Sequence, residues 1–114
     1  MGFTVDLHSD AGTSTLVLTG DLDSSTAPAF RSAVEEAAAG APITLVLEVS
    51  ALRYLSSAGL RVLVFARQKM GSDTRLVLAG ANDAVTETIR LTGFHNSMTF
   101  RRTAGSGLDD AGPR

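Results

Sequence analysis

The sequence predicts a single α/β domain in which a mixed β-sheet of four to five strands carries helices mainly on one face. Two apolar segments at the start have the two-residue alternation of half-buried strands. After them, short apolar runs alternate with longer segments that have helical spacing. Such alternation is typical of parallel strands that are joined by helices. The expected order is therefore β-β-α-β-α-β-α-β.

The first two strands are predicted from alternation and from the turn between them. Phe3, Val5 and Leu7 alternate with polar residues, which indicates a strand with one buried face. Residues 9–12 (SDAG) are typical of a turn. Residues 15–19 (TLVLT) form the second strand, which we expect to be antiparallel to the first and to end at Gly20.

The first helix is predicted from its start and stop signals. Ser25 or Thr26 can cap it, and Pro28 is tolerated in a first helical turn. Gly40 and Pro42 are typical of a helix end. The expected buried side recurs at helical spacing and consists of Phe30, Ala33, Val34 and Ala37.

The centre of the chain predicts a strand that is followed directly by a helix. Residues 43–49 (ITLVLEV) are typical of a strand buried on both faces, and residues 58–70 form a helix. Ser56 and Ser57 therefore lie at a helix start. A serine there can accept hydrogen bonds from free backbone N–H groups, and a phosphate on it would be stabilised by the same groups and by the helix dipole.

This second helix has a polar stripe beside its core side. At about 100° per residue, the expected solvent stripe is Ser57, Arg61, Val64 and Gln68, and the expected core side is Val62, Leu63, Ala66 and Met70. Leu60, Val64 and Phe65 flank the solvent stripe, so the helix is apolar beyond the usual arc. A neighbouring loop could cover these residues, or they could form a docking surface for a partner protein.

The remaining elements follow the same alternation. Residues 74–79 predict a strand, and Asn82 is the expected cap of a third helix whose apolar side is Val85, Ile89 and either Thr92 or Leu91. Gly93 fits a left-handed helix end, with Phe94 packed back on Ile89. Residues 98–100 predict a short last strand. We expect residues 1–102 to form the domain and residues 103–114 to be a disordered tail, since apolar residues nearly vanish there.

Composition excludes several classes of protein. A hydrophobic fraction of 44% with a charged fraction of 19% is typical of an ordinary soluble domain. The net charge of −2 and the lack of a basic patch argue against direct nucleic-acid binding. No cysteine is present, which excludes disulfides and thiolate sites. We expect a cytoplasmic protein, since no signal peptide or membrane-spanning run is visible.

No catalytic constellation is visible, so we do not expect an enzyme or a bound cofactor. The only histidines, His8 and His95, are far in sequence from Ser57, and no nucleophile elbow or phosphate-binding glycine loop occurs. Asp21 and Asp23 could bind a metal ion or act as acid and base. Two carboxylates without further ligands are a weak metal signal, so a turn acid and a near-cap acid are the favoured interpretation.

Two segments resemble a known family. Residues 54–60 (YLSSAGL) are similar to the switch-serine segment of STAS domains, specifically of bacterial anti-sigma factor antagonists. That pattern places Ser57 at the phosphorylated position, whereas Ser56 stands where many members have Asp and is a second possible acceptor. Residues 19–28 (TGDLDSSTAP) are similar to the G-x-L-D-x-x-T-A segment of the same family, which lies beside the switch serine.

The resemblance implies a STAS fold over about residues 3–100 and a phosphorylation switch. When unphosphorylated, the protein would bind an anti-sigma factor that is also a serine kinase, and a serine phosphatase would reverse the modification. ATP and Mg²⁺ would belong to these partners. A monomer or weak dimer is expected, without contact to membrane or nucleic acid. The alternative is a STAS scaffold or ligand-sensing module without phosphorylation. The expected partner-binding residues are Asp21, Asp23, Ser56, Ser57, Ala58, Gly59, Arg61 and Val64.

Overall fold

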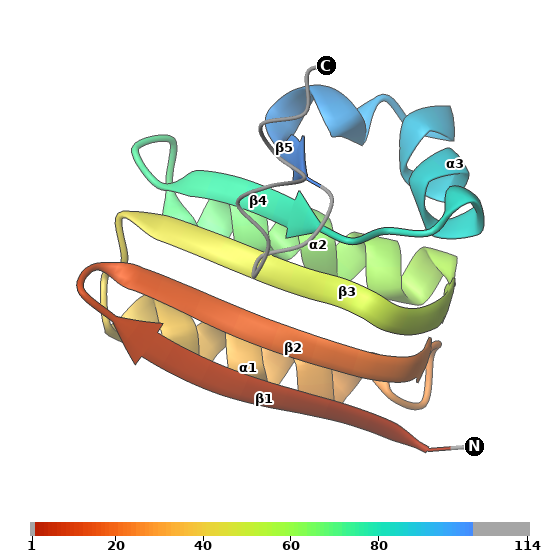
Figure 1. The fold of residues 1–114 in the computed structure, drawn as a ribbon, viewed down its shortest axis with the longest axis horizontal. Helices are drawn as coiled ribbons and strands as arrows, with labels where there is room; N and C mark the ends of the chain where they lie inside the picture. Colours follow the sequence, from red (N-terminus) through yellow and green to blue (C-terminus); the bar gives the residue numbers. More distant parts are fainter. Residues whose placement is uncertain (1, 102–114) are drawn as a thin grey trace.

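The computed structural model describes residues 2–101, and the expected tail at 103–114 lies outside the described residues. The element order confirms the predicted alternation (Figure 1). The elements are β1 (Phe3–Asp10), β2 (Thr13–Leu22), α1 (Ala27–Ala39), β3 (Thr44–Leu55), α2 (Ser57–Met70), β4 (Arg75–Ala79), α3 (Asp83–Leu91), the short 3₁₀ helix η1 (Phe94–Ser97) and β5 (Thr99–Arg101).

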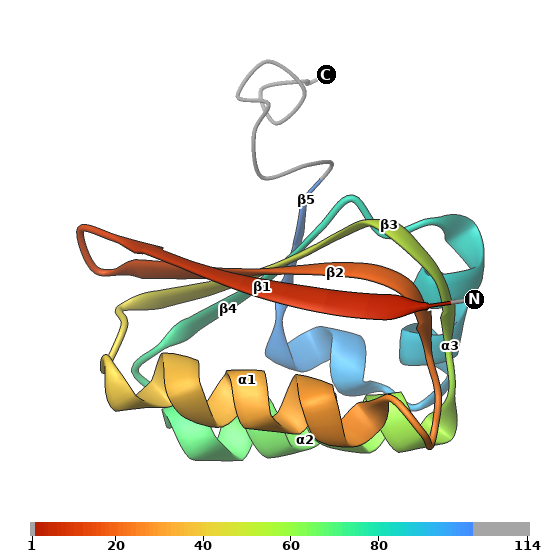
Figure 2. The ribbon, with the colours of Figure 1, turned by 90° about the horizontal axis from the view of Figure 1, so that it is seen from below.

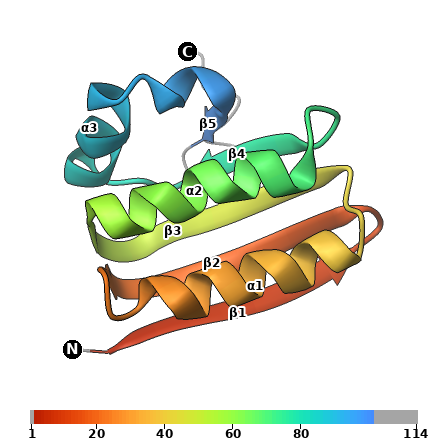
Figure 3. The same ribbon diagram turned by 180° about the vertical axis from the view of Figure 1, so that it is seen from behind.

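The strands form one mixed five-stranded sheet in the order β1-β2-β3-β4-β5. β1 and β2 pair antiparallel, and every later neighbouring pair is parallel. α1 and α2 lie side by side on one face of this sheet, as Figure 2 shows. They run in the same direction, so that both start at the end where β2 and β3 finish (Figure 3). Helix starts and loops therefore gather at the carboxyl ends of the parallel strands, the usual place for functional residues in such sheets.

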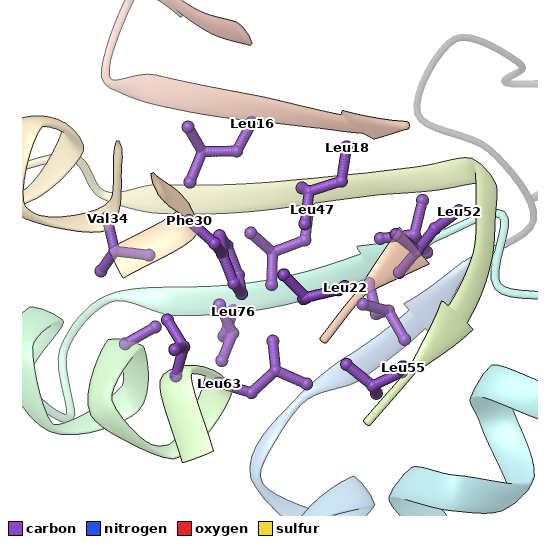
Figure 4. Close-up of a cluster of buried hydrophobic side chains, with 14 of the residues drawn as sticks. Leu16, Leu18, Leu22, Phe30, Val34, Leu47, Leu52, Leu55, Leu63 and Leu76 are labelled. Carbon is purple, nitrogen blue, oxygen red and sulfur yellow. The ribbon is translucent and has the colours of Figure 1, made fainter. Parts of the chain in front are cut away.

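The main hydrophobic core lies between this sheet face and the two helices (Figure 4). Leucines at alternate positions of β2 and β3 point toward the helices, as the two-residue period of a strand requires. Phe30 of α1 is fully buried among them and is the largest such side chain. The other fully buried large side chains are Leu16, Leu18, Leu22, Leu45, Leu47, Leu76, Leu78, Ile89, Val34 and Val85.

The predicted ends of β2 and β3 are wrong. β2 does not end at Gly20 but continues to Leu22, and β3 runs through Leu55 rather than ending at residue 49. Gly20 adopts a φ of +99°, which lets the strand bend without ending. The pairing of β2 with β3 shifts register immediately after Gly20 and again between Val17 and Thr19. Both strands therefore curve together and finish side by side, with Leu22 opposite Leu55.

Smaller differences concern apolar residues at element ends. Ile43 is 71% exposed and precedes β3. Leu91 is 77% exposed and Thr92, the C-cap residue, is exposed too, so neither belongs to the buried side of α3, which consists of Val85 and Ile89. The reason is helix geometry, because successive side chains of a helix are rotated by about 100°. Leu91, two residues after Ile89, therefore points about 200° away from the buried side. The predicted cap and end of α3 are confirmed, because Asn82 Oδ1 accepts from the Val85 amide at 2.8 Å and Gly93 has a φ of +80°.

Candidate functional site

The loops that follow β2 and β3 meet at one end of the sheet. The register places Asp21 beside Tyr54, and the amide of Ser56 donates to the carbonyl oxygen of Leu22 at 2.9 Å. This bond ties the end of β2 to the start of α2. The structure therefore brings together the two segments that the sequence analysis singled out, residues 19–28 and residues 54–60.

The two adjacent serines have different roles in this arrangement. Ser56 is the N-cap of α2, and its Oγ accepts from the amide of Gly59 at 3.2 Å. Ser57 is the first residue of the helix and is exposed. Its hydroxyl makes no hydrogen bond to any other residue between 2 and 101. Ser56 is thus engaged in capping the helix, whereas Ser57 presents a free hydroxyl to solvent.

We expect the Ser56→Ala variant to be less stable than the wild type by about 1 kcal/mol, the usual cost of losing a helix N-cap. Ser56→Asp is the matched control, because its carboxylate can accept the same bond and is favoured at a helix start. Urea unfolding of the three proteins measures the difference. Equal stability of Ser56→Ala and wild type would show that the cap bond contributes nothing.

Gly59 fixes the position of this helix start against the sheet. It is buried, and a Cβ atom there would lie 2.7 Å from Cγ of Leu22 and 2.8 Å from Cδ1 of Leu55. Only glycine lets α2 approach the ends of β2 and β3 this closely. Gly59 thus allows α2, the helix that presents Ser57, to pack closely against the strand ends. Gly59 itself is not part of the exposed surface.

The carboxylate of Asp23 is used within its own loop. It accepts from the amide and the hydroxyl of Ser25 at 2.9 and 2.8 Å and from the amide of Thr26 at 3.2 Å. The two bonds from Ser25 are the main cause that holds the pKa of Asp23 below its ordinary value of 3.8. Asp23 therefore stabilises the turn that leads into α1, as the turn-acid interpretation predicts.

Asp21 takes part in a surface ion pair. Its Oδ2 lies 3.2 Å from Nη2 of Arg53, a residue of β3 that is far from it in sequence. The register between the strand ends creates this pair, so the sequence pattern alone gave no sign of it. Among residues 2–101, no three His, Cys, Asp or Glu side chains lie close enough together to hold a metal ion.

The predicted faces of α2 are confirmed. Ser57, Arg61, Val64 and Gln68 are exposed, and Val62, Leu63 and Ala66 are buried. Met70, the last residue of the expected core side, is half-buried and packs against the core. The apolar residues that flank the exposed stripe differ in burial. Leu60 and Phe65 are half-buried and pack against the core, whereas Val64 remains 38% exposed.

Two grooves border the exposed stripe of α2. The first, of about 500 Å³, separates α2 from the chain after α3 and is lined by Ser57, Leu60, Arg61, Val64, Thr92, Gly93, Phe94 and Ser97. The second, of about 370 Å³, separates α2 from α1 and is lined by Ser24, Ala27, Pro28, Arg31, Ala58, Arg61 and Val62. We call them the α2–α3 groove and the α1–α2 groove. Arg61 lines both of them, and Ser57 lies at the edge of the first.

The sequence analysis missed the contribution of Arg31. Its guanidinium carbon lies 4.0 Å from the centre of the Phe65 ring, so it covers an aromatic side chain of the neighbouring helix. It also lies 3.9 Å from Glu35 in an exposed ion pair of the same helix. No periodic signal links α1 to α2, so only the packing of the two helices reveals this position.

The chain is similar to known proteins over most of its length. A family model described as "Mlab, STAS domain" matches residues 5–101. The chain is 31% identical over 98 residues to anti-sigma-F factor antagonist RsfB of Mycobacterium tuberculosis, a match that covers 86% of this chain and 79% of the relative. Within the described residues no helix is long and apolar enough to cross a bilayer.

Solved structures show the same fold. The crystal structure of an anti-sigma factor antagonist from Mycobacterium paratuberculosis superimposes with a TM-score of 0.83 at 31% identity, covering 96% of this chain and 91% of that one. The unphosphorylated anti-sigma factor antagonist SpoIIAA superimposes with a TM-score of 0.74 at 18% identity, covering 85% of this chain and 87% of that one. The second likeness supports the fold alone.

Proposed function

This chain belongs to the STAS domain family, and from that membership we propose that it is an anti-sigma factor antagonist switched by phosphorylation of Ser57. Unphosphorylated, it binds an anti-sigma factor and thereby frees a sigma factor for RNA polymerase. Phosphorylated, it releases the anti-sigma factor. The relatives that support this proposal are themselves named anti-sigma factor antagonists.

The observation that carries the choice of residue is the unequal use of Ser56 and Ser57. The Ser56 hydroxyl accepts the capping bond from Gly59, whereas the exposed Ser57 hydroxyl is free to reach a kinase active site. A phosphate on Ser57 would also lie at the start of α2, where free backbone N–H groups and the helix dipole favour an anion. Modification there leaves the cap bond in place, so the fold is preserved.

A phosphate on Ser57 changes the docking surface rather than the fold. It adds about −1.5 to −2 charges at pH 7. Ser57 borders the α2–α3 groove beside Leu60 and Val64, so a docked partner would have to remove water from the new charge. Desolvating an unpaired charge is costly, which is why partner binding is lost.

The proposed partners supply the chemistry of the switch. The anti-sigma factor acts as the serine kinase with its own ATP and Mg²⁺, and a separate serine phosphatase removes the phosphate. This chain is the substrate of both enzymes, is not itself an enzyme, and works in the cytoplasm. Of the residues expected to bind the partner, Ser57, Arg61 and Val64 are exposed, Asp21, Asp23, Ser56 and Ala58 are half-buried, and only Gly59 is buried.

Reconstituted transcription tests this function. The anti-sigma factors of the source organism are purified and each is added, with its sigma factor, to RNA polymerase and a cognate promoter. We expect the unphosphorylated protein to restore transcription with one of these pairs, and the phosphorylated protein to restore none. Failure to restore transcription with any pair would favour the alternative of a scaffold without a sigma factor.

A further inference from the structure

The α1–α2 groove carries positive charge on both of its walls. Arg31 lies on the α1 wall and Arg61 on the α2 wall, and none of the residues that line this groove is acidic. The chain as a whole has a net charge of −2, so this positive charge is local. A local cationic groove on an acidic protein selects for an anionic group that reaches into it, rather than for a positively charged partner surface.

The two arginines differ in how fully they are engaged. Arg61 forms no ion pair or hydrogen bond with any other residue of the described part of the chain. Arg31 is oriented by its contact with Phe65, and Glu35 lies 3.9 Å from it in a pair whose side chains are 56% and 52% exposed. An exposed pair of this kind contributes little. Arg31 therefore keeps most of its capacity to bind a second carboxylate, and Arg61 keeps all of it.

The α1–α2 groove is continuous with the proposed docking surface around Ser57. Arg61 lines the α2–α3 groove together with Ser57 and the α1–α2 groove together with Arg31. A partner that covers Ser57 thus also reaches Arg61. Guanidinium groups bind carboxylates in a planar, directional way, which makes a carboxylate side chain the fitting occupant.

We propose that the α1–α2 groove binds an acidic side chain, Asp or Glu, of the anti-sigma factor between Arg31 and Arg61. This inference rests on the proposed function, because it assigns chemistry to the same docking surface. It makes Arg61 the main electrostatic contact and Arg31 an auxiliary one. Both arginines are exposed to solvent, so added salt screens their attraction for the carboxylate and weakens it.

Affinity measurements with charge-neutralised variants test the proposal. The probe is the purified anti-sigma factor of the source organism that binds the wild type. We expect Arg61→Gln to bind about tenfold more weakly and with a smaller dependence on salt, and Arg31→Gln to bind a few times more weakly, in the range of charge contacts at an interface rim. Lys69→Gln is the matched control, because it removes the same charge from the last turn of α2, and it should bind within about twofold of wild type.

The Arg61→Lys variant identifies the partner group directly. Lys69 is the only lysine of the chain, so this variant places one new side-chain amine in the groove. A carbodiimide joins an amine to a nearby carboxylate as an amide, with the lost water taken up as a urea. We expect peptide mapping of the treated complex to show a cross-link from position 61 to an Asp or Glu of the anti-sigma factor, and none from Lys69.

The possible outcomes separate this inference from the proposed function. Binding of the wild type together with unchanged affinity of Arg61→Gln, or a cross-link from Lys69 alone, would overturn the inference and leave the function intact. Failure of every anti-sigma factor of the organism to bind the wild type would overturn both.

Discussion

The Ser57→Asp variant should lose at least about 100-fold in affinity for the anti-sigma factor, or roughly 2.8 kcal/mol of binding free energy. The introduced carboxylate lies at the edge of the α2–α3 groove beside Leu60 and Val64. A bound partner must remove water from that charge, which is costly where the charge meets an apolar partner surface. Titration calorimetry or surface plasmon resonance with the purified anti-sigma factor measures the loss.

Two controls separate charge from size and from folding. Ser57→Asn has the same shape as the aspartate variant without its charge, and Ser57→Ala removes the hydroxyl. We expect both to bind within about threefold of wild type, since Ser57 is exposed and makes no described hydrogen bond that they would remove. The melting temperature of Ser57→Asp should match or slightly exceed that of wild type, because an acid at a helix start is favourable. Equal binding of the Asp and Asn variants would refute a charge-based switch.

The Phe30→Ala variant should be less stable than wild type by about 3–5 kcal/mol. Phe30 is fully buried, and Figure 4 shows its ring among core side chains of β3, β4 and α1, including Leu47, Leu76 and Val34. Truncation removes apolar area and leaves a cavity between helix and sheet that the surrounding leucines fill only in part. Chemical unfolding in urea gives the free energy directly.

Phe30→Leu is the matched control for that loss, because it keeps an apolar side chain at the same position. It should cost less than half as much as Phe30→Ala, since the remaining side chain fills most of the space. A small domain has only about 5–15 kcal/mol of total stability, so Phe30→Ala should also raise the unfolded fraction measurably at physiological temperature. A loss below 1 kcal/mol would contradict the central position of this ring.

The predictable part of the fold is the part set by local pattern. The alternation in residues 3–7, the helical spacing of Phe30, Val34 and Ala37, and the cap at Asn82 are each fixed by neighbouring residues. The strand ends, in contrast, were determined by pairing between strands that are distant in the sequence. β2 and β3 continue to Leu22 and Leu55 because each strand pairs with the other along their whole length, and a window of sequence contains no information about such a partner.

The candidate site also has features that local sequence patterns predict and features that depend on tertiary packing. The position of Ser57 at a helix start follows from the adjacent apolar strand and helical segment, and the exposed stripe from Ser57 to Gln68 follows from helical periodicity. The ion pair of Asp21 with Arg53 and the contact of Arg31 with Phe65 join residues more than 30 positions apart. These contacts depend on strand register and on helix packing, so the α1–α2 groove became visible only in the structure.

Mapping the phosphate after reaction with the anti-sigma factor and Mg²⁺-ATP tests the central claim most directly. The proteins to compare are wild type, Ser57→Ala and Ser56→Asp, the last of which keeps a capping oxygen but no hydroxyl. We predict one phosphate on Ser57 in the wild type and in Ser56→Asp, and none in Ser57→Ala. A phosphate on Ser56 in the wild type, or an undiminished mass shift in Ser57→Ala, would contradict the assignment of Ser57 as the switch residue.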